Sequence, residues 1–123
     1  MASVLVIDDD DQIRELLEMY LKADGHYVIL ASSGSEGIVL FDQNRFDLVI
    51  TDVVMPNGGG IEVIMHIHRT GEGTPIIAIS GGALRQEEHF FNLSAAAAFG
   101  VTQTLAKPFS EEQLRATIAK VLC

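Results

Sequence analysis

Residues 47–51 read Asp-Leu-Val-Ile-Thr, a short and almost continuously apolar run that predicts a β-strand. A strand with so little polar alternation is typical of a parallel sheet that helices cover on both faces. Comparable runs occupy residues 4–7, 27–31, 75–80 and 103–106, and each of them predicts a further strand. The sequence therefore favours a sheet of five parallel strands.

Segments with helical spacing separate these runs. Apolar residues recur on one stripe over residues 11–22, and Gly25 is expected to end that helix in a left-handed conformation. The sequences Ser33–Glu36 and Ser110–Gln113 have capping-box spacing and predict two further helix starts. The expected helices cover residues 11–22, 34 to about 44, 61–69, 87–99 and 111–122. Alternating strands and helices predict an α/β fold with right-handed crossovers.

The composition fits one globular domain. The chain has 123 residues, 48% of them hydrophobic, and no repeat or linker interrupts it, so residues 1–123 are interpreted as a single domain. A formal net charge of -9 argues against nucleic-acid binding by this domain and disfavours anionic membranes. The apolar runs fall far short of the roughly 18 residues of a membrane span. No signal peptide is recognised and Cys123 is the single cysteine, so a cytoplasmic location is expected.

Polar reactive groups stand at the ends of four predicted strands. They are Asp8 and Asp9 after the first, Asp52 after the third, Ser80 at the end of the fourth and Lys107 after the fifth. The carboxyl ends of parallel strands meet at one edge of an open sheet, so these groups are expected to converge there. Each residue alone is an ordinary polar strand end, whereas the joint pattern indicates a site.

Three aspartates in one site need a compensating positive charge. Two carboxylates about 4 Å apart repel each other by roughly 4 kcal/mol at an effective dielectric constant of about 20. The site must therefore bind a cation or keep a proton. Carboxylates, a carbonyl and waters are the usual protein ligands of Mg²⁺, and a lysine with a hydroxyl suits phosphate oxygens. This set of groups favours transfer of a phosphoryl group to one aspartate.

Four segments together resemble the receiver domain of two-component response regulators. They are VLVIDD at residues 4–9, DLVITDVVMP at 47–56, PIIAIS at 75–80 and KPF at 107–109. They stand in the family's order and spacing, and the resemblance covers essentially the whole chain. It implies a flavodoxin-like, doubly wound five-stranded parallel sheet of order 2-1-3-4-5 with five helices.

The resemblance also implies a role for each acidic residue. Asp52 would accept the phosphoryl group. The cofactor Mg²⁺ would be bound by Asp9, Asp52 and the backbone carbonyl of Val54. Asp8 would act largely through water.

On the phosphate side, the resemblance implies that Ser80 is the switch hydroxyl and that Lys107 pairs with the phosphoryl oxygens. The bond between Lys107 and Pro108 would be cis. The family's aromatic switch position is Thr104 here, so a ring that swings inward is not available for signalling. The interval between Ser80 and Lys107 is longer than in compact members, which predicts a reshaped loop and helix after the fourth strand.

Two further positions suggest a long-lived phosphoryl group. Val54 and Gly82 occupy sites that often tune its lifetime, and neither side chain can orient an attacking water. Slow autodephosphorylation is therefore our hypothesis. Gly59 stands where the family often has an acidic residue, and Gly60 keeps the usual glycine.

Other polar residues receive structural interpretations. Asp10 and Asp11 are expected at the start of the first helix, where their charges favour its dipole. His66 and His68 are two positions apart on a predicted helix, so they do not share a face and are expected in solvent. Asp47 is expected to be solvated or hydrogen-bonded locally.

The leading functional hypothesis is a stand-alone receiver, because the chain ends right after the last predicted helix. Its expected partners are a sensor histidine kinase or histidine phosphotransfer protein, and an unidentified downstream protein. It would not be an enzyme with an external substrate. Its output would be protein binding or phosphoryl relay, between which the sequence does not choose. The alternatives are a fragment of a larger hybrid kinase or regulator, a phosphorylation-independent pseudo-receiver, and a metal-dependent phosphatase, the weakest of these.

Overall fold

The computed structural model describes residues 1–53, 60–80 and 100–122. Within them lies a single parallel sheet of five strands in the order β2-β1-β3-β4-β5. The elements are β1 (Ser3–Ile7), α1 (Asp11–Ala23), β2 (Tyr27–Ala31), α2 (Gly34–Gln43), β3 (Leu48–Asp52), α3 (Gly60–Thr70), β4 (Ile76–Ser80), β5 (Gln103–Ala106) and α6 (Glu111–Leu122). The predicted α/β fold and strand order are therefore confirmed.

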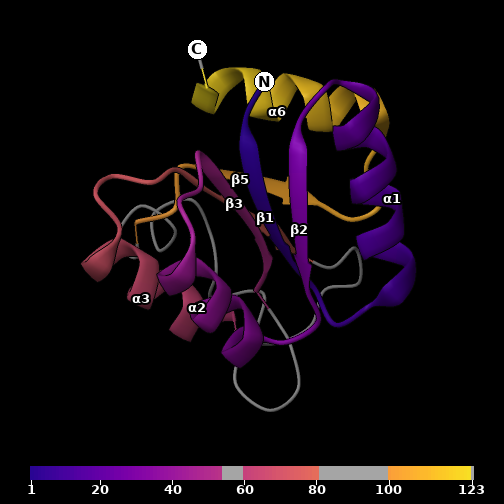
Figure 1. Ribbon diagram of the computed structural model, residues 1–123. Coiled ribbons are helices and arrows are strands. Elements are labelled where there is room, and N and C mark those ends of the chain that lie inside the picture. The colour runs from indigo at the N-terminus through magenta and orange to yellow at the C-terminus, as the bar shows by residue number, and fades with distance from the viewer. Residues whose placement is uncertain (54–59, 81–99, 123) are drawn as a thin grey trace.

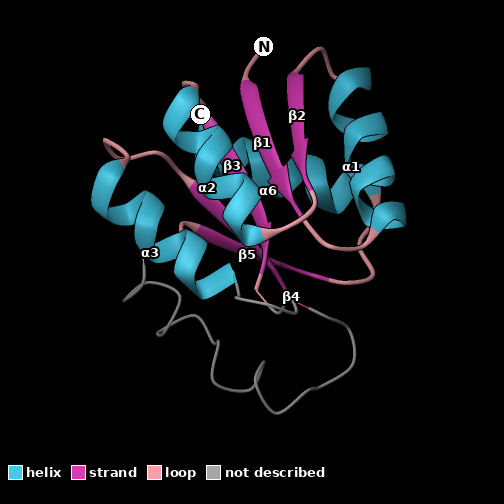
Figure 2. Ribbon diagram, turned by 60° about the horizontal axis from the view of Figure 1, so that its bottom comes forward, coloured by secondary structure: helices cyan, strands magenta, loops and turns pink. Residues whose placement is uncertain are grey.

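Helices cover both faces of the sheet. Figure 1 shows α1 and α6 on one side and α2 and α3 on the other, and Figure 2 shows the same arrangement from a second direction. A hydrophobic core lies between the sheet and the helices on each face, and successive residues of β1 alternate between these two cores. Val4 and Val6 pack with Leu17 of α1, whereas Leu5 and Ile7 pack with α3. Every residue of β3 is buried, as its apolar sequence predicts.

The expected helix over residues 87–99 lies outside the described residues, as does the reshaped loop that the sequence predicts before it. Four helices are described in the rest of the chain. None of the helices in the described ranges combines the length and the apolar character that crossing a bilayer requires.

The third strand differs from its prediction by one residue. It begins at Leu48 and includes Asp52, whose backbone is in register with Ile79 of β4. Asp47 lies before the strand and is bound by a residue far away in sequence: its Oδ2 accepts a hydrogen bond of 2.8 Å from the backbone N–H of Ser3. Asp47 is exposed, as the solvated alternative of its prediction expects, but its hydrogen bond is not local, because the parallel pairing of β1 with β3 brings Ser3 to this point.

The predicted helix caps are present. At α6, Ser110 Oγ accepts a hydrogen bond from the Gln113 N–H and Gln113 Oε1 accepts one from the Ser110 N–H, which completes a capping box. At α2, Ser33 Oγ accepts from the Glu36 N–H, while Glu36 Oε1 accepts from the N–H of Ser32. Gly25 follows α1 with a φ of 83°, the left-handed value that glycine adopts without strain.

The prediction that His66 lies in solvent is wrong. The His66 side chain is 20% exposed and its Nε2 lies 2.8 Å from Asp42 Oδ1. Its ring meets Phe41 edge-on. Helices α2 and α3 pack side by side on the same face of the sheet, and this brings the histidine of one to the aspartate of the other. His68 is exposed, as expected.

Candidate functional site

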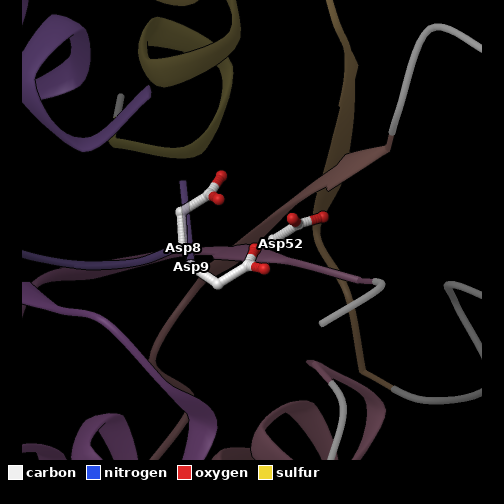
Figure 3. A group of neighbouring side chains, drawn as sticks. All are labelled: Asp8, Asp9 and Asp52. Carbon is white, nitrogen blue, oxygen red and sulfur yellow. The ribbon is translucent and has the colours of Figure 1, made fainter. Parts of the chain in front are cut away.

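Three carboxylates gather at the carboxyl edge of the sheet. Asp8 and Asp9 follow β1, and Asp52 ends β3, which pairs directly with β1. One carboxylate oxygen from each lies within 4.8 Å of the others. Figure 3 shows the three side chains at the adjacent ends of β1 and β3, and we call them the acidic pocket. Asp8 and Asp52 are buried, whereas Asp9 is exposed.

Asp8 is fully buried, with an exposed fraction of 0%. Its Oδ1 accepts a hydrogen bond of 2.9 Å from the backbone N–H of Asp10. Its Oδ2 has no hydrogen-bond partner among the described residues. Burial raises the pKa of Asp8 to about 6, the Asp10 N–H opposes this rise, and the charge of Asp52 adds to it. The ionised pocket is therefore electrostatically costly without a bound cation.

Lys107 supplies one positive charge to the pocket. Its Nζ lies 3.1 Å from Asp8 Oδ2, an ion-pair distance without hydrogen-bond alignment. The same ammonium donates a hydrogen bond of 3.3 Å to Asp52 Oδ2. Burial by itself lowers the pKa of Lys107, but the charges of Asp8 and Asp52 outweigh it and hold this pKa above its ordinary value.

These groups suit a divalent cation. One ammonium faces three carboxylates, so two negative charges remain when all four groups are ionised. The buried Asp8 Oδ2 without a hydrogen bond and the three converging oxygens form a hard, all-oxygen donor set. Mg²⁺ prefers such oxygen ligands and takes only one or two carboxylates with waters. The residues present therefore fit a magnesium site.

The backbone around Asp52 leaves no room for a side chain at Gly60, the first residue of α3. A Cβ at this position would lie 1.8 Å from the backbone carbonyl oxygen of Asp52. The Gly60 N–H also donates a hydrogen bond of 3.1 Å to the Val53 carbonyl. This close approach holds the end of β3 against the start of α3.

The start of α1 shapes the other side of the pocket. The Asp10 carboxylate caps the helix by accepting hydrogen bonds from the N–H groups of Gln12 and Ile13. Asp11 lies in the first turn. Both residues therefore have the helix-start positions that the sequence predicts for them, and the Asp8–Asp9 turn is tied to the helix.

The remaining predicted residues lie on β4, on β5 and in the loop that follows it. Ser80 is the last residue of β4, and its backbone is in register with Ala106 of β5. Thr104 pairs with Ala78 and is half-buried. The peptide bond between Lys107 and Pro108 is cis. Val54 and Gly82 lie outside the described residues, as does Gly59.

Sequence reasoning missed Arg14. Its Nη1 donates a hydrogen bond of 2.6 Å to the backbone carbonyl of Asp8, and its Nη2 pairs with the Asp11 carboxylate. The spacing of Asp11 and Arg14, three residues apart on a helix, is the signal that identifies their ion pair. No comparable pattern in the sequence predicts the contact with the Asp8 carbonyl.

Known proteins are similar to this chain in sequence and architecture. Residues 4–119 match the family model described as the response regulator receiver domain. The response regulator MprA of Mycobacterium sp. (strain KMS) is 36% identical over 119 residues, which are 97% of this chain and 50% of that protein. This chain thus spans about half the length of the MprA relatives that it matches.

Solved structures superpose on nearly the whole chain. A response regulator receiver domain protein from Clostridium thermocellum superposes with a TM-score of 0.87 at 30% identity, covering 99% of this chain and 94% of that one. The chemotaxis response regulator CheY4 of Vibrio cholerae gives a TM-score of 0.86 at 32% identity, with 99% of each chain covered. The fold, the acidic pocket and these matches together show that the chain belongs to the response regulator receiver domain family.

Proposed function

We propose that this receiver takes a phosphoryl group onto Asp52. The phosphorylated domain then either presents a changed protein-binding surface or relays the group to another protein. The observation that carries the proposal is the arrangement around Asp52. Its buried carboxylate contacts the Lys107 ammonium and lies within 4.8 Å of oxygens of Asp8 and Asp9. A nucleophilic carboxylate, a cation and a metal-binding donor set are the groups that phosphoryl transfer requires.

In the proposed reaction, a carboxylate oxygen of Asp52 attacks the phosphorus of a phosphohistidine on the donor protein. An O–P bond forms while the P–N bond to the imidazole breaks, and the imidazole leaves with the bonding electron pair and takes up a proton. Lys107 Nζ, 3.3 Å from Asp52 Oδ2, is placed to offset the charge on the phosphoryl oxygens. We assign Ser80 the role of the hydroxyl that hydrogen-bonds the phosphoryl group afterwards.

Asp9, Asp52 and the Val54 carbonyl are the proposed ligands of Mg²⁺, and Asp8 acts through water. When bound, the ion neutralises charge between the carboxylates and the phosphoryl oxygens. The buried Asp8 Oδ2, which has no hydrogen bond among the described residues, supports a role for a cation and its waters at this point. Asp8 also keeps Lys107 beside the pocket, 3.1 Å from its Oδ2.

Receiver domains partner with histidine kinases and are generally not turnover enzymes. We propose that residues 1–123 form one receiver domain and that its donor is a sensor histidine kinase or a histidine phosphotransfer protein. A downstream protein would read the phosphorylated state. Val54 and Gly82 stand two positions after the acceptor and the switch residue in the sequence, and neither side chain can orient an attacking water, so we expect autodephosphorylation to be slow.

Intact-mass spectrometry after incubation with a small phosphodonor tests the proposal. The wild type is expected to gain one phosphoryl group in Mg²⁺ and none in EDTA, and Asp52→Asn is expected to gain none. A time course after removal of the donor then reports the lifetime, and loss within seconds would contradict slow hydrolysis. If the wild type gains no mass under any condition, the proposal fails and a phosphorylation-independent binding module becomes the better account.

A further inference from the structure

We infer that Arg14 is a positioning residue whose guanidinium fixes the Asp8–Asp9 turn and thereby sets the affinity of the acidic pocket for a divalent cation. The inference rests on the proposed metal-dependent function. It extends that function to a residue outside the carboxylates, on the first turns of α1.

The guanidinium of Arg14 bridges the turn and the helix. One nitrogen, Nη1, donates a hydrogen bond of 2.6 Å to the Asp8 carbonyl, and the other, Nη2, pairs with the carboxylate of Asp11. The Arg14 side chain is only 15% exposed, although its ionic partner Asp11 is 81% exposed. A planar fork of donors makes two such contacts at fixed relative geometry, which a lysine ammonium cannot do.

The contacted carbonyl belongs to the peptide that joins Asp8 to Asp9. The orientation of this peptide therefore sets the direction in which the Asp9 side chain points. Figure 3 shows this side chain pointing toward Asp52. No hydrogen bond or ion pair from a described residue holds the exposed Asp9 carboxylate itself. The position of this proposed ligand thus depends on the backbone of the turn.

Arg14 is one of several groups that hold this turn. The Asp10 N–H donates to Asp8 Oδ1, and Arg14 donates to the Asp8 carbonyl. The Asp8 N–H donates in turn to the Ala31 carbonyl, which continues the pairing of β1 with β2. Loss of Arg14 removes the hydrogen bond to the Asp8 carbonyl, so the peptide between Asp8 and Asp9 is less constrained. An outer partner of this kind commonly changes metal affinity by about 10- to 100-fold.

The ion pair with Asp11 is the smaller of the two contacts. Pairs three residues apart on an exposed helix surface add only weakly to the stability of the helix. If Arg14 merely stabilises α1, removal of either partner has a similar small effect and metal affinity is unchanged. If it positions the turn, removal of Arg14 weakens metal binding and removal of the Asp11 charge does not.

The experiment measures Mn²⁺ binding by electron paramagnetic resonance, with the free ion as the signal and Mn²⁺ as the probe in place of Mg²⁺. The variants are Arg14→Met, Arg14→Lys and Asp11→Asn, and urea unfolding in EDTA shows that each is folded. We expect Arg14→Met to raise the Mn²⁺ dissociation constant by about 10-fold or more, Arg14→Lys to give an intermediate value, and Asp11→Asn to match the wild type.

Equal Mn²⁺ affinity in Arg14→Met and the wild type would overturn the inference. So would a loss of affinity in Asp11→Asn as large as that in Arg14→Met, because it would assign the effect to the ion pair. If Arg14→Met does not fold, Arg14→Lys decides: wild-type affinity in that variant overturns the inference and weakened affinity supports it. A wild type that binds no Mn²⁺ would overturn both this inference and the proposed metal site. A wild type that binds Mn²⁺, with Arg14→Met binding it equally well, would overturn this inference alone.

Discussion

The metal-free protein is expected to become more stable when Asp8 is replaced by asparagine. Asp8 is fully buried, and its pKa is raised to about 6 from an ordinary value of 3.8. Each pH unit by which the folded-state pKa exceeds the unfolded-state pKa corresponds to about 1.4 kcal/mol, so the ionisation of Asp8 costs the folded state about 3 kcal/mol at pH 7. Asparagine has no charge, and its side-chain oxygen can still accept the hydrogen bond from the Asp10 N–H. Urea unfolding in EDTA at pH 7 measures the difference.

The higher stability of Asp8→Asn relative to the wild type is expected to disappear as the pH falls. The folded state of the wild type takes up a proton on Asp8 near pH 6, whereas the unfolded chain takes it up near 3.8. The folded state binds more protons between these values, so the wild type gains stability as the pH falls from 7 toward 4. Asp8→Asn lacks this gain, and the two unfolding free energies should converge at low pH.

Glu15→Gln is the matched control, because it removes one negative charge from an exposed position of α1. It is expected to change stability little, and by an amount that does not follow the titration of Asp8. An Asp8→Asn protein that is less stable than the wild type at pH 7 would contradict the electrostatic account. A difference that stays constant down to pH 4 would contradict it as well.

Gly60→Ala is expected to disrupt both the fold and the site. Alanine normally favours a helix over glycine by about 1 kcal/mol, but here its Cβ would lie 1.8 Å from the Asp52 carbonyl oxygen. A backbone carbonyl cannot rotate away from a clash as a flexible side chain can, so the start of α3 or the end of β3 must move. We expect the free energy of unfolding to fall by about 2 kcal/mol or more. We also expect phosphorylation to be lost, because Asp52 moves with its carbonyl.

Gly73→Ala separates the clash from simple loss of stability. Gly73 has a φ of 78° and nothing within 4 Å of a Cβ at its position, so alanine there meets strain without a clash. It is expected to cost about 1–2 kcal/mol and to leave phosphorylation intact. Urea unfolding and intact-mass analysis of both variants check this. A Gly60→Ala protein with wild-type stability and phosphorylation would show that the packing at Asp52 is looser than the close approach of Gly60 implies.

The sequence predicts the sheet well because the relevant signals are local. Residues 47–51 lack polar alternation, and every residue of β3 is indeed buried. The strand order came with the family resemblance, since alternating strands and helices are compatible with more than one order. The sequence predicts the end of β3 one residue early, because a charged residue is typical of the end of a strand. Pairing with β4 nevertheless continues through Asp52.

The carboxylates and the lysine of the site were also predictable, because each of them follows or ends a strand and parallel strands share one carboxyl edge. Contacts made to backbone N–H and carbonyl groups left no such trace. The hydrogen bond from Arg14 to the Asp8 carbonyl and the contact of Gly60 with the Asp52 carbonyl depend on how the turns pack. The pairing of Asp47 with Ser3, 44 residues away, is of the same kind.

The proposed function depends above all on the identity of the phosphoryl acceptor. The acceptor must be Asp52 rather than Asp8 or Asp9. Borohydride reduces an aspartyl phosphate to homoserine, which peptide mass spectrometry locates by residue. We would treat the Mg²⁺-loaded wild type with a small phosphodonor, reduce it and map the product, with Asp52→Asn as the control. We expect homoserine at position 52 in the wild type and none in the variant. Homoserine at position 8 or 9, or at no position in a protein that has gained phosphoryl mass, would contradict the assignment of Asp52 as the acceptor.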